Sequence, residues 1–389
     1  MSVTAAKGFV AAGGSAGIKA SGVPDVAIVA TTDGRAVPTA GVFTSNLAAA
    51  APVQVSRAHL QSTGGKAAGV ILTSGNANAA TGVPGREAAL ALCGALADGI
   101  GVTTEEILIC QTGLIGIPFP TTVAVPNVPG IVSGRAGDRD AAAAAARAIM
   151  TTDTVPKEVL VQGAGFTVGG MAKGAAMLAP NMATMLALCT TDAAVDAATL
   201  RLALRAAVDA SFNVMSVDGC TSTNDTVLVM ASGAGATPTL DALTAALSEA
   251  CLSLSEQMVN DAEGATKVSH VRVIGAESDG AAHQAARKVA DSQLVQCSLN
   301  GEDPYWGRVV SELGSAGVAF DIDKVTVAYG GTLVCVGGVA ATHDEAAVKA
   351  HMKGRHIELV CDLGLGGGSG AVLSTDLGYG YIDENRTTS

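Results

Sequence analysis

Short apolar runs alternate along the chain with Ala-rich segments in which apolar residues recur at three- and four-residue steps. Short continuous runs indicate buried strands, and the longer period indicates helices packed on one face. Predicted strands cover residues 25–31, 69–73, 106–112, 159–162, 225–231, 271–274, 325–329, 332–336 and 356–363. Predicted helices cover residues 86–97, 138–149, 194–210, 240–262 and 281–290, with Asp192 and Asp241 as N-terminal anchors. This alternation favours an α/β protein in which helical layers enclose sheet.

The glycine motifs do not fit nucleotide-binding loops. No predicted strand is followed by GxGxxG, and GxxxxGK[ST] is absent, so neither a Rossmann site nor a P-loop is expected. The run at residues 364–370 has neither spacing and is predicted to be a hairpin turn. The apolar run at 271–274 gives way to the polar residues ESDG at 277–280. This change near residue 276 indicates the start of a smaller C-terminal domain.

Composition narrows the class of protein. Hydrophobic residues make up 49% of the 389 positions but aromatic residues only 3%, and no apolar stretch is long enough to span a membrane. The first residues lack the apolar core of a signal peptide, so we expect a cytoplasmic protein. The net charge of −12 attracts neither nucleic acid nor an anionic membrane surface.

The cysteines and histidines show no ligand spacing. Eight cysteines occur singly, without a CxxC pair, and the six histidines follow no metal-binding pattern. The sequence therefore predicts buried, reduced thiols in place of a zinc site or a disulfide framework. No metal and no bound organic cofactor are expected.

One run at mid-chain carries candidate chemistry: GGMAKGAAMLAPNMATML at residues 169–186, where a Gly-rich turn is expected to precede an apolar strand. A threonine before a strand is most often a structural residue. If the chain cut itself between Ala183 and Thr184, however, the Thr184 hydroxyl would lie beside a new α-amine. The pKa of such an amine is about 7.7–8.0, which leaves a useful fraction of it neutral near neutral pH and able to act as a base. One residue would then supply both the nucleophile and the base.

This run resembles the processing and active-site segment of the ornithine acetyltransferase family, the glutamate N-acetyltransferases of arginine biosynthesis. Further segments agree in order along nearly the whole chain. They are GIKASG (17–22), AGVFT (40–44), SGNANA (74–79), TGLIG (112–116), AIMTTD (148–153), STNDT (222–226), DAEGATK (261–267) and WGR (306–308). So many ordered matches shift the interpretation of Thr184 from structural to catalytic.

The resemblance implies the residues of the reaction centre. The chain is expected to cleave itself between Ala183 and Thr184, after which Thr184 is the nucleophile. Thr112 and Gly113 correspond to the oxyanion hole of the family, which stabilises the charge that develops during acyl transfer. The strand predicted over residues 106–112 ends where a glycine lets the backbone approach a ligand closely.

The resemblance also implies the substrate-binding residues. They are Thr151 or Thr152, between which the sequence does not decide, with Lys173, Thr184, Glu263, Asn385 and Ser389. Lys173 is expected in a Gly-flanked loop, where it could pair with a substrate carboxylate. Glu263 is expected to close the helix at 240–262. The tail after Asn385 is about one residue shorter than the family pattern, which leaves the Ser389 contact open.

The fold implied by the resemblance is a four-layer αββα sandwich over residues 1–275, with a smaller C-terminal domain over residues 276–389. Cleavage would give an α chain (1–183) and a β chain (184–389), and pairs of these would form a heterotetramer. The expected reaction moves an acetyl group from N²-acetyl-L-ornithine to L-glutamate through an acetyl-Thr184 ester.

Three alternatives stay open at this stage. Some family members also use acetyl-CoA to make N-acetylglutamate, and no feature of the sequence separates the two kinds. Related self-processing folds include amidohydrolases and aminopeptidases, in which water captures the acyl-enzyme. A non-catalytic binding protein is the third, although Thr112, Gly113, Lys173, Thr184 and Glu263 together argue against it.

Overall fold

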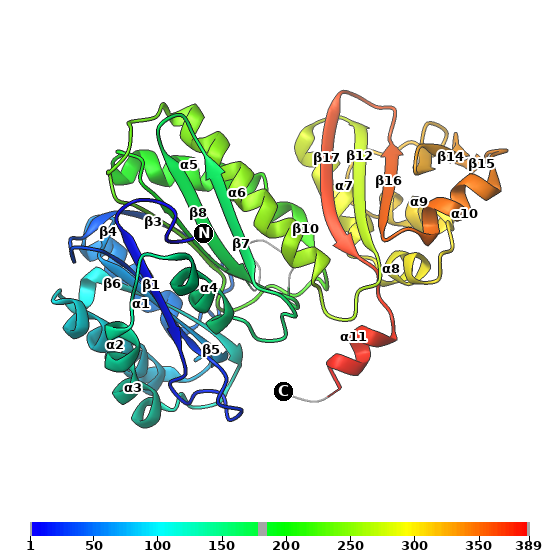
Figure 1. Cartoon of the computed structure of the whole chain (residues 1–389). Helices are drawn as coiled ribbons and strands as arrows, with labels where there is room; N and C mark the ends of the chain where they lie inside the picture. Colours follow the sequence, from blue (N-terminus) through cyan, green and yellow to red (C-terminus); the bar gives the residue numbers. More distant parts are fainter. Residues whose placement is uncertain (1, 178–184, 387–389) are drawn as a thin grey trace. The chain divides into compact units, whose positions relative to one another are not determined.

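The computed structural model describes residues 2–177 and 185–386, and the chain divides into two compact units. The first unit holds the residues up to 213 together with 220–258. The second holds residues 214–219 and the chain from residue 259 onward. The second unit therefore begins before residue 276, the boundary expected from the sequence. Each unit has sheets and helices of its own (Figure 1).

Two sheets form the centre of the first unit. The four-stranded sheet has the order β1 (Phe9–Gly14), β2 (Val26–Thr31), β5 (Gly69–Asn76), β6 (Ile107–Leu114). The six-stranded sheet has the order β4 (Lys66–Ala67), β3 (Val37–Phe43), β11 (Thr226–Ala231), β9 (Leu186–Thr191), β8 (Thr167–Lys173), β7 (Lys157–Gln162). Side chains from both sheets share one core, in which Val29 and Leu72 belong to the four-stranded sheet and Leu188 and Leu228 to the six-stranded sheet.

Helices cover the outer faces of these sheets. On the four-stranded sheet lie α2 (Gly82–Ile100) and α3 (Thr121–Ser133); on the six-stranded sheet lie α5 (Ala197–Asp209) and α6 (Leu240–Asn260). The described part of the chain before α6 also contains two further helices, α1 (Ala51–Ser62) and α4 (Arg139–Ala148), and the 3₁₀ turns η1 (Thr104–Glu106) and η2 (Phe212–Val214). The expected four-layer αββα sandwich is confirmed.

The strands of the four-stranded sheet are continuous apolar runs because both of their faces are covered. Ile71 and Ile109 point to the core beneath α2, whereas their neighbours Val70, Leu72 and Leu108 point to the core between the sheets. The absence of polar alternation in the sequence thus follows from the layered architecture.

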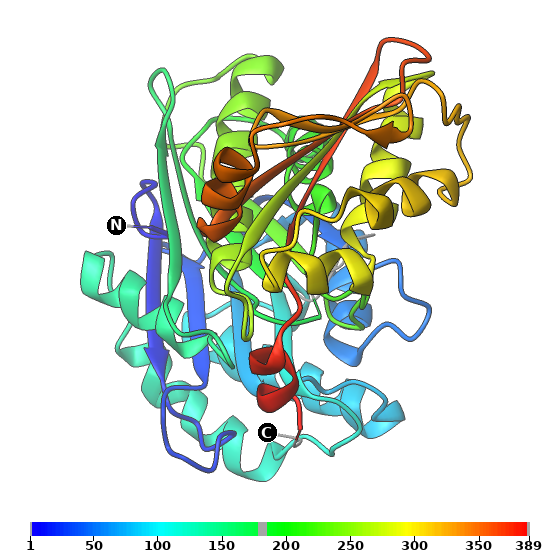
Figure 2. The same ribbon diagram turned by 90° about the vertical axis from the view of Figure 1, so that its right-hand side faces the viewer.

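The second unit is built on a seven-stranded mixed sheet (Figure 2). Its order is β10 (Met215–Ser216), β17 (Gly368–Thr375), β12 (Val268–Ala276), β16 (His356–Asp362), β13 (Thr326–Tyr329), β14 (Thr332–Val336), β15 (Val339–Ala340). Its helices are α7 (Asp279–Ala290), α8 (Gln293–Asn300), α9 (Trp306–Gly314), α10 (Glu345–Lys353) and α11 (Tyr379–Glu384). Helix α7 packs on β12 and β17. No helix among the described residues of either unit is long and apolar enough to cross a membrane.

All predicted strands and helices are present, but neither predicted helix anchor is right. Asp241 lies inside the first turn of α6, where the Thr239 hydroxyl accepts a hydrogen bond from the Ala242 N–H at 3.2 Å. Asp192 does not cap α5. Helix α5 begins at Ala197, three residues after the predicted start, and Asp196 caps it by accepting a hydrogen bond from the Thr199 N–H at 2.7 Å. The Asp192 carboxylate instead accepts from the Thr167 N–H at 2.7 Å and joins the end of β9 to the start of β8.

The hairpin predicted at residues 364–370 is also wrong. Strand β17 pairs with β12, and β12 lies between β17 and β16, so these glycines connect strands that are not neighbours. A Cβ at Gly368 would lie 2.3 Å from the Ser278 backbone, and one at Gly370 would lie 2.4 Å from the backbone of His283. Glycine at these two positions therefore allows the start of α7 to pack directly against the backbone of β17.

The expectation of buried thiols holds for most cysteines. Eight free cysteines are present, and six of them are buried, whereas Cys220 and Cys297 are exposed. Cys297 belongs to the short helix α8, whose buried face is formed by other residues.

Candidate active site

The glycines at the start of the central run lie in a strand, and the predicted turn is wrong. Strand β8 is buried along nearly its whole length, and a Cβ at Gly169 would lie 1.8 Å from the carbonyl oxygen of Ser2. Glycine at this position therefore allows the N-terminal segment to cross the strand. Lys173 is the last residue of β8 and only 3% exposed, so it does not lie in an open loop.

The structure brings Lys173 and Thr112 together from opposite sheets. Thr112 lies on β6 of the four-stranded sheet, and its side chain is buried. The Lys173 ammonium donates a hydrogen bond to the Thr112 hydroxyl over 3.4 Å. Two residues 61 positions apart, both named by the resemblance, are thus in contact.

Asp153 links this pair to the segment of the candidate threonines. Its Oδ1 accepts hydrogen bonds from the Lys157 ammonium at 2.5 Å and from the Gly174 N–H at 2.8 Å. Its Oδ2 accepts from the Thr151 N–H at 3.0 Å and lies 3.9 Å from the Lys173 ammonium. Burial raises the pKa of Asp153, but the charges of Lys173 and Lys157 outweigh burial and lower it to about 2. The carboxyl is therefore ionised at neutral pH.

Gly113 occupies a backbone conformation that only glycine adopts readily. Its φ is +128°, and a Cβ would lie 2.3 Å from the carbonyl carbon of Gly75 on the neighbouring strand β5. The pairing of β5 and β6 is irregular at this point. The strand end that carries Thr112 and Gly113 therefore packs backbone to backbone against β5.

Three charged residues of this cluster were missed by sequence reasoning. Asp153 and Lys157 follow the candidate threonines directly, and a buried ion pair has no local sequence signal. Lys19 was quoted only within the segment 17–22, and its ammonium donates to the Met150 carbonyl at 2.7 Å. Partial burial lowers the pKa of Lys19, Asp25 opposes this, and the charge of Lys173 lowers it further. The motif AIMTTD was the available signal for Asp153.

Glu263 and Asn385 lie together in the second unit. Helix α6 ends at Asn260, so Glu263 does not close it, and its side chain is buried. The Asn385 amide donates to Glu263 Oε2 at 2.8 Å. Gly264 allows this because its φ is +62° and a Cβ there would lie 2.1 Å from the Tyr381 nitrogen of α11.

Not every predicted residue can be placed. Ala183, Thr184 and Ser389 lie outside the described residues. Thr112, Gly113, Thr151, Thr152 and Lys173 belong to the first unit, whereas Glu263 and Asn385 belong to the second.

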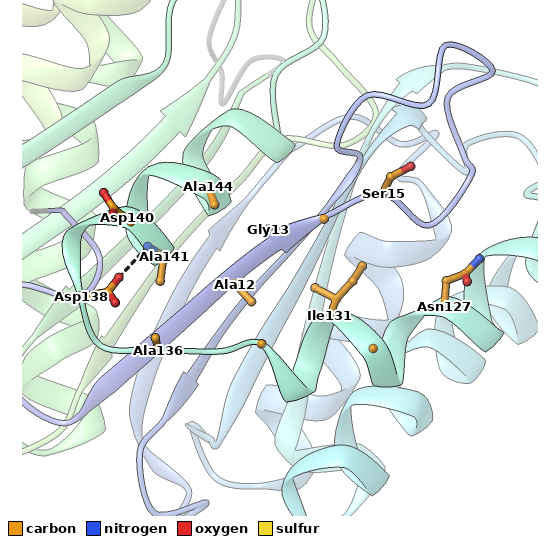
Figure 3. Close-up of a pocket in the computed structure, with 13 residues that line it drawn as sticks. Ala12, Gly13, Ser15, Asn127, Ile131, Ala136, Asp138, Asp140, Ala141 and Ala144 are labelled. Atoms are coloured by element: carbon orange, nitrogen blue, oxygen red, sulfur yellow. Dashed lines mark hydrogen bonds between the residues drawn. The ribbon is translucent and has the colours of Figure 1, made fainter.

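A pocket elsewhere on the first unit is separate from these residues (Figure 3). Its lining comes from β1, α3 and α4 and their neighbouring turns, and includes Gly13, Ile131 and Ala144 but none of the candidate site residues. Asp138, which also lines it, accepts from the Ala141 N–H at 2.8 Å and caps α4. Among the residues that the structure describes, no cluster of His, Cys, Asp or Glu is arranged to hold a metal ion.

The first unit therefore combines an αββα sandwich with a buried hydroxyl, an ammonium and an ionised carboxylate where the strands of both sheets end. This is the kind of site in which an enzyme stabilises the charge of an acyl-transfer reaction.

Comparison with known proteins agrees with a site for acyl transfer. The family model described as "ArgJ family" matches residues 10–387. The chain is 44% identical to the arginine biosynthesis bifunctional protein ArgJ of Streptomyces coelicolor, with all of both chains covered. It is 46% identical to the protein of that name from Mycolicibacterium paratuberculosis, covering all of this chain and 96% of the relative. The chain belongs to the ArgJ family and is an acyltransferase of arginine biosynthesis.

Solved structures with sequence similarity cover part of the chain. One is the arginine biosynthesis bifunctional protein of Bacillus halodurans, at 33% identity and a TM-score of 0.49, covering 51% of this chain and 96% of that one. Another is ornithine acetyltransferase from Mycobacterium tuberculosis complexed with ornithine, at 41% identity and a TM-score of 0.42, covering 46% and 94%.

Proposed function

We propose that this enzyme transfers an acetyl group from N²-acetyl-L-ornithine to L-glutamate through an ester on Thr184, after cleaving itself between Ala183 and Thr184. The Thr184 hydroxyl attacks the acetyl carbonyl, the α-amine of Thr184 takes the hydroxyl proton, and ornithine leaves with that proton. The glutamate amine then attacks the ester carbonyl, the Thr184 oxygen leaves and takes up the proton that the glutamate amine loses, and N-acetylglutamate is released with the Thr184 hydroxyl restored. The observation that carries the proposal is the buried contact between Thr112 and Lys173 in a chain of the ArgJ family.

The geometry of Thr112 supports a role in the oxyanion hole. A threonine hydroxyl has one hydrogen to donate, and it accepts through its lone pairs. Because the Lys173 ammonium donates to this oxygen, the Thr112 hydrogen remains available for a developing oxyanion. Gly113 supports the same role, since only a residue without a side chain fits against Gly75.

Among the candidate substrate contacts, we propose Thr151 in preference to Thr152. Thr151 is partly buried and its N–H is held by Asp153, the carboxylate that also lies near Lys173. Thr152 is exposed. Comparing Thr151→Val with the matched control Thr152→Val tests the choice, since only the former is expected to raise KM for acetylornithine. Equal effects of the two changes would contradict it.

We further propose that Lys173 binds a substrate carboxylate and that Glu263, Asn385 and Ser389 are substrate-binding residues. The Glu263 carboxylate is suited to an ammonium group of ornithine, and the hydrogen bond from Asn385 fixes one of its oxygens. The ornithine complex of the Mycobacterium tuberculosis relative motivates ornithine as the ligand.

Sheet pairing supports two chains that stay together after cleavage. Strand β8 precedes the proposed cut, and its residues Val168–Lys173 pair with β9, which follows the cut. Strands β3 and β11 also join the two parts of the chain. We therefore propose an α chain (1–183) and a β chain (184–389) assembled as an α₂β₂ heterotetramer, with the eight free thiols supporting a cytoplasmic location.

Intact-mass spectrometry before and after addition of acetylornithine tests the central proposal. The expected result is two chains, of which the β chain gains one acetyl group, whereas Thr184→Ala gives one uncleaved and inactive chain. Thr190→Ala is a matched control, because Thr190 lies on β9 with its hydroxyl bonded to Val3 and should not affect cleavage. A single full-length chain in active wild-type enzyme would overturn the proposal.

Two further outcomes separate the alternatives. The relatives are named bifunctional proteins, which motivates acetyl-CoA as a second donor. Formation of N-acetylglutamate from acetyl-CoA and glutamate alone would establish it. Release of acetate from acetylornithine at a rate unaffected by glutamate would instead indicate an amidohydrolase or aminopeptidase.

A further inference from the structure

The loop that carries Thr151, residues 149–153, belongs to no helix or strand. Helix α4 ends at Ala148, and β7 begins only at Lys157. Such a loop is fixed by hydrogen bonds to other parts of the chain, because it lacks the repeating backbone bonds of a helix or sheet. The side chains that supply these bonds come from the four-stranded sheet and its connections, and from the end of the 149–153 loop itself.

The peptide group that joins Met150 to Thr151 is held between two charged side chains. The Lys19 ammonium donates to its oxygen, the Met150 carbonyl, over 2.7 Å. Its hydrogen, on the Thr151 nitrogen, is donated to Oδ2 of Asp153 over 3.0 Å. Hydrogen bonds with a charged partner are stronger than those between neutral groups. A cation and an anion therefore fix the orientation of the backbone directly before the Thr151 side chain.

Lys19 is itself fixed in position at both its backbone and its ammonium. Asp25 is fully buried, and its carboxylate accepts hydrogen bonds from the N–H groups of Ala16 at 2.6 Å, Ile18 at 2.6 Å and Lys19 at 3.0 Å. The Lys19 ammonium donates a second hydrogen bond, to the Pro24 carbonyl over 3.2 Å. The turn between β1 and β2 thus presents this lysine as a fixed point for the 149–153 loop.

The same lysine lies against the strand pair that carries the candidate oxyanion hole. A Cβ at Gly75 would lie 2.8 Å from Cγ of Lys19, so the lysine stem packs on the backbone of β5 at the residue that Gly113 also contacts. The preceding residue, Ser74, is buried, and its hydroxyl donates to the Ala148 carbonyl over 2.6 Å. Lys19 and Ser74 therefore join the 149–153 loop to β5 and β6.

We propose that Lys19 is a positioning residue for substrate binding, which sets the place of the Thr151 side chain relative to β5 and β6. It does so by holding the Met150 carbonyl, while Asp153 holds the Thr151 N–H and Ser74 holds the end of α4. Lys19 needs no contact with the substrate for this role. The inference rests on the proposed function, because it requires Thr151 to bind acetylornithine.

Lys19→Met tests the proposal in the full-length enzyme. Methionine keeps an unbranched stem that can lie against Gly75, but it has no hydrogen to donate to the Met150 carbonyl. KM for acetylornithine should rise on the order of tenfold, as expected for the loss of a hydrogen bond made by a charged group, and kcat should change by about twofold or less. Lys7→Met is the control, because Lys7 is exposed and its loss should change neither constant.

A double-mutant cycle with Thr151→Val separates an indirect role from direct contact. If Lys19 acts by placing Thr151, its loss costs little once the Thr151 hydroxyl is gone, so the double variant should have a KM within about twofold of that of Thr151→Val. If Lys19 instead bound the substrate itself, the two increases in KM would multiply. Ser74→Ala serves if Lys19→Met does not fold: it removes only the bond to Ala148, and should raise KM about threefold, again without multiplying the effect of Thr151→Val.

The outcomes distinguish failure of the positioning role from failure of the proposed function. If the wild-type enzyme uses acetylornithine and Thr151→Val raises KM, but Lys19→Met has the KM of the wild type, the positioning role alone is overturned. It is also overturned if the effects of Lys19→Met and Thr151→Val multiply, or if the loss falls on kcat instead of KM. If Thr151→Val leaves KM unchanged, or the wild-type enzyme does not use acetylornithine, the corresponding part of the proposed function falls together with this inference.

Discussion

The two regions that carry the candidate residues differ in how their polar groups are held. In the first unit, Thr112, Asp153, Lys157 and Lys173 are all buried and joined by hydrogen bonds or ion pairs. In the second unit, the buried Glu263 is bonded to the exposed Asn385, just after the short helix α11. Groups at the reaction centre must keep their positions to be useful. A contact near a chain end can adjust affinity without disturbing the fold.

The largest effect is expected at the hub of the buried network. Asp153→Ala removes the partner of Lys157 and the nearby counter-charge of Lys173, and should lower the free energy of unfolding by about 3–5 kcal/mol. Urea unfolding measures this loss. Asp33→Ala is the control, because its pair with Arg35 is exposed and no measurable change is expected. Equal stability of the two variants would show that the network is not structural.

Gly113→Ala should damage activity more than any contact in the second unit does. The added Cβ would collide with Gly75 and displace the proposed oxyanion hole, so kcat should fall by about 10²–10³-fold. Gly116→Ala is a matched control, since its φ is also positive but no atom lies within 4 Å of the added Cβ. Steady-state kinetics with acetylornithine would reveal the difference, and similar kcat values would place the hole elsewhere.

The acid stability of the first unit should reflect Asp153. Its pKa is lowered to about 2 in the folded chain, below the ordinary value of 3.8, so its contribution is complete above about pH 4 and is lost as the pH falls through about 2. The contribution should be about 2 kcal/mol, measured as the fall in unfolding free energy over that interval. A curve for Asp153→Asn with the same slope as the wild type would contradict the assignment.

The smallest effect is expected in the second unit. Asn385→Ala removes one hydrogen bond from Glu263 but leaves an exposed position, so stability should change by about 0.5 kcal/mol or less. KM for acetylornithine should rise by about two- to tenfold with kcat unchanged. A loss of kcat as large as that of Gly113→Ala would show that the two regions do not divide affinity from rate.

Local pattern was sufficient for most of the elements. The strands at 69–73 and 106–112 were predictable because both faces of these strands are covered, so that apolar residues such as Val70 and Ile71 follow one another directly. The helices were predictable from their three- and four-residue periodicity. Errors arose where a local signal served another purpose: Asp192 bonds to a strand, and the glycines at 364–370 make room for α7.

The candidate site was predictable only through resemblance, and only in part. Thr112, Gly113 and Lys173 follow from ordered motifs, but the strand position of Lys173 does not, because Gly169 and Gly170 have the local character of a turn. Asp153 and Asp225 belong to the motifs AIMTTD and STNDT, yet nothing in those letters tells which residue is buried or what it bonds.

The sequence by itself determined the α/β class, the positions of the principal strands and helices, and the family, because periodicity and ordered motifs are local properties of the chain. Only the tertiary structure decided that Thr112 contacts Lys173 of the opposite sheet and that Asp153 is ionised between two lysines. It also decided that Asn224 donates a hydrogen bond to the Gln111 carbonyl and that Asp225 accepts one from the Met185 N–H. Those properties depend on burial and on distances between residues far apart in the chain, which hydrophobic packing of the four layers sets.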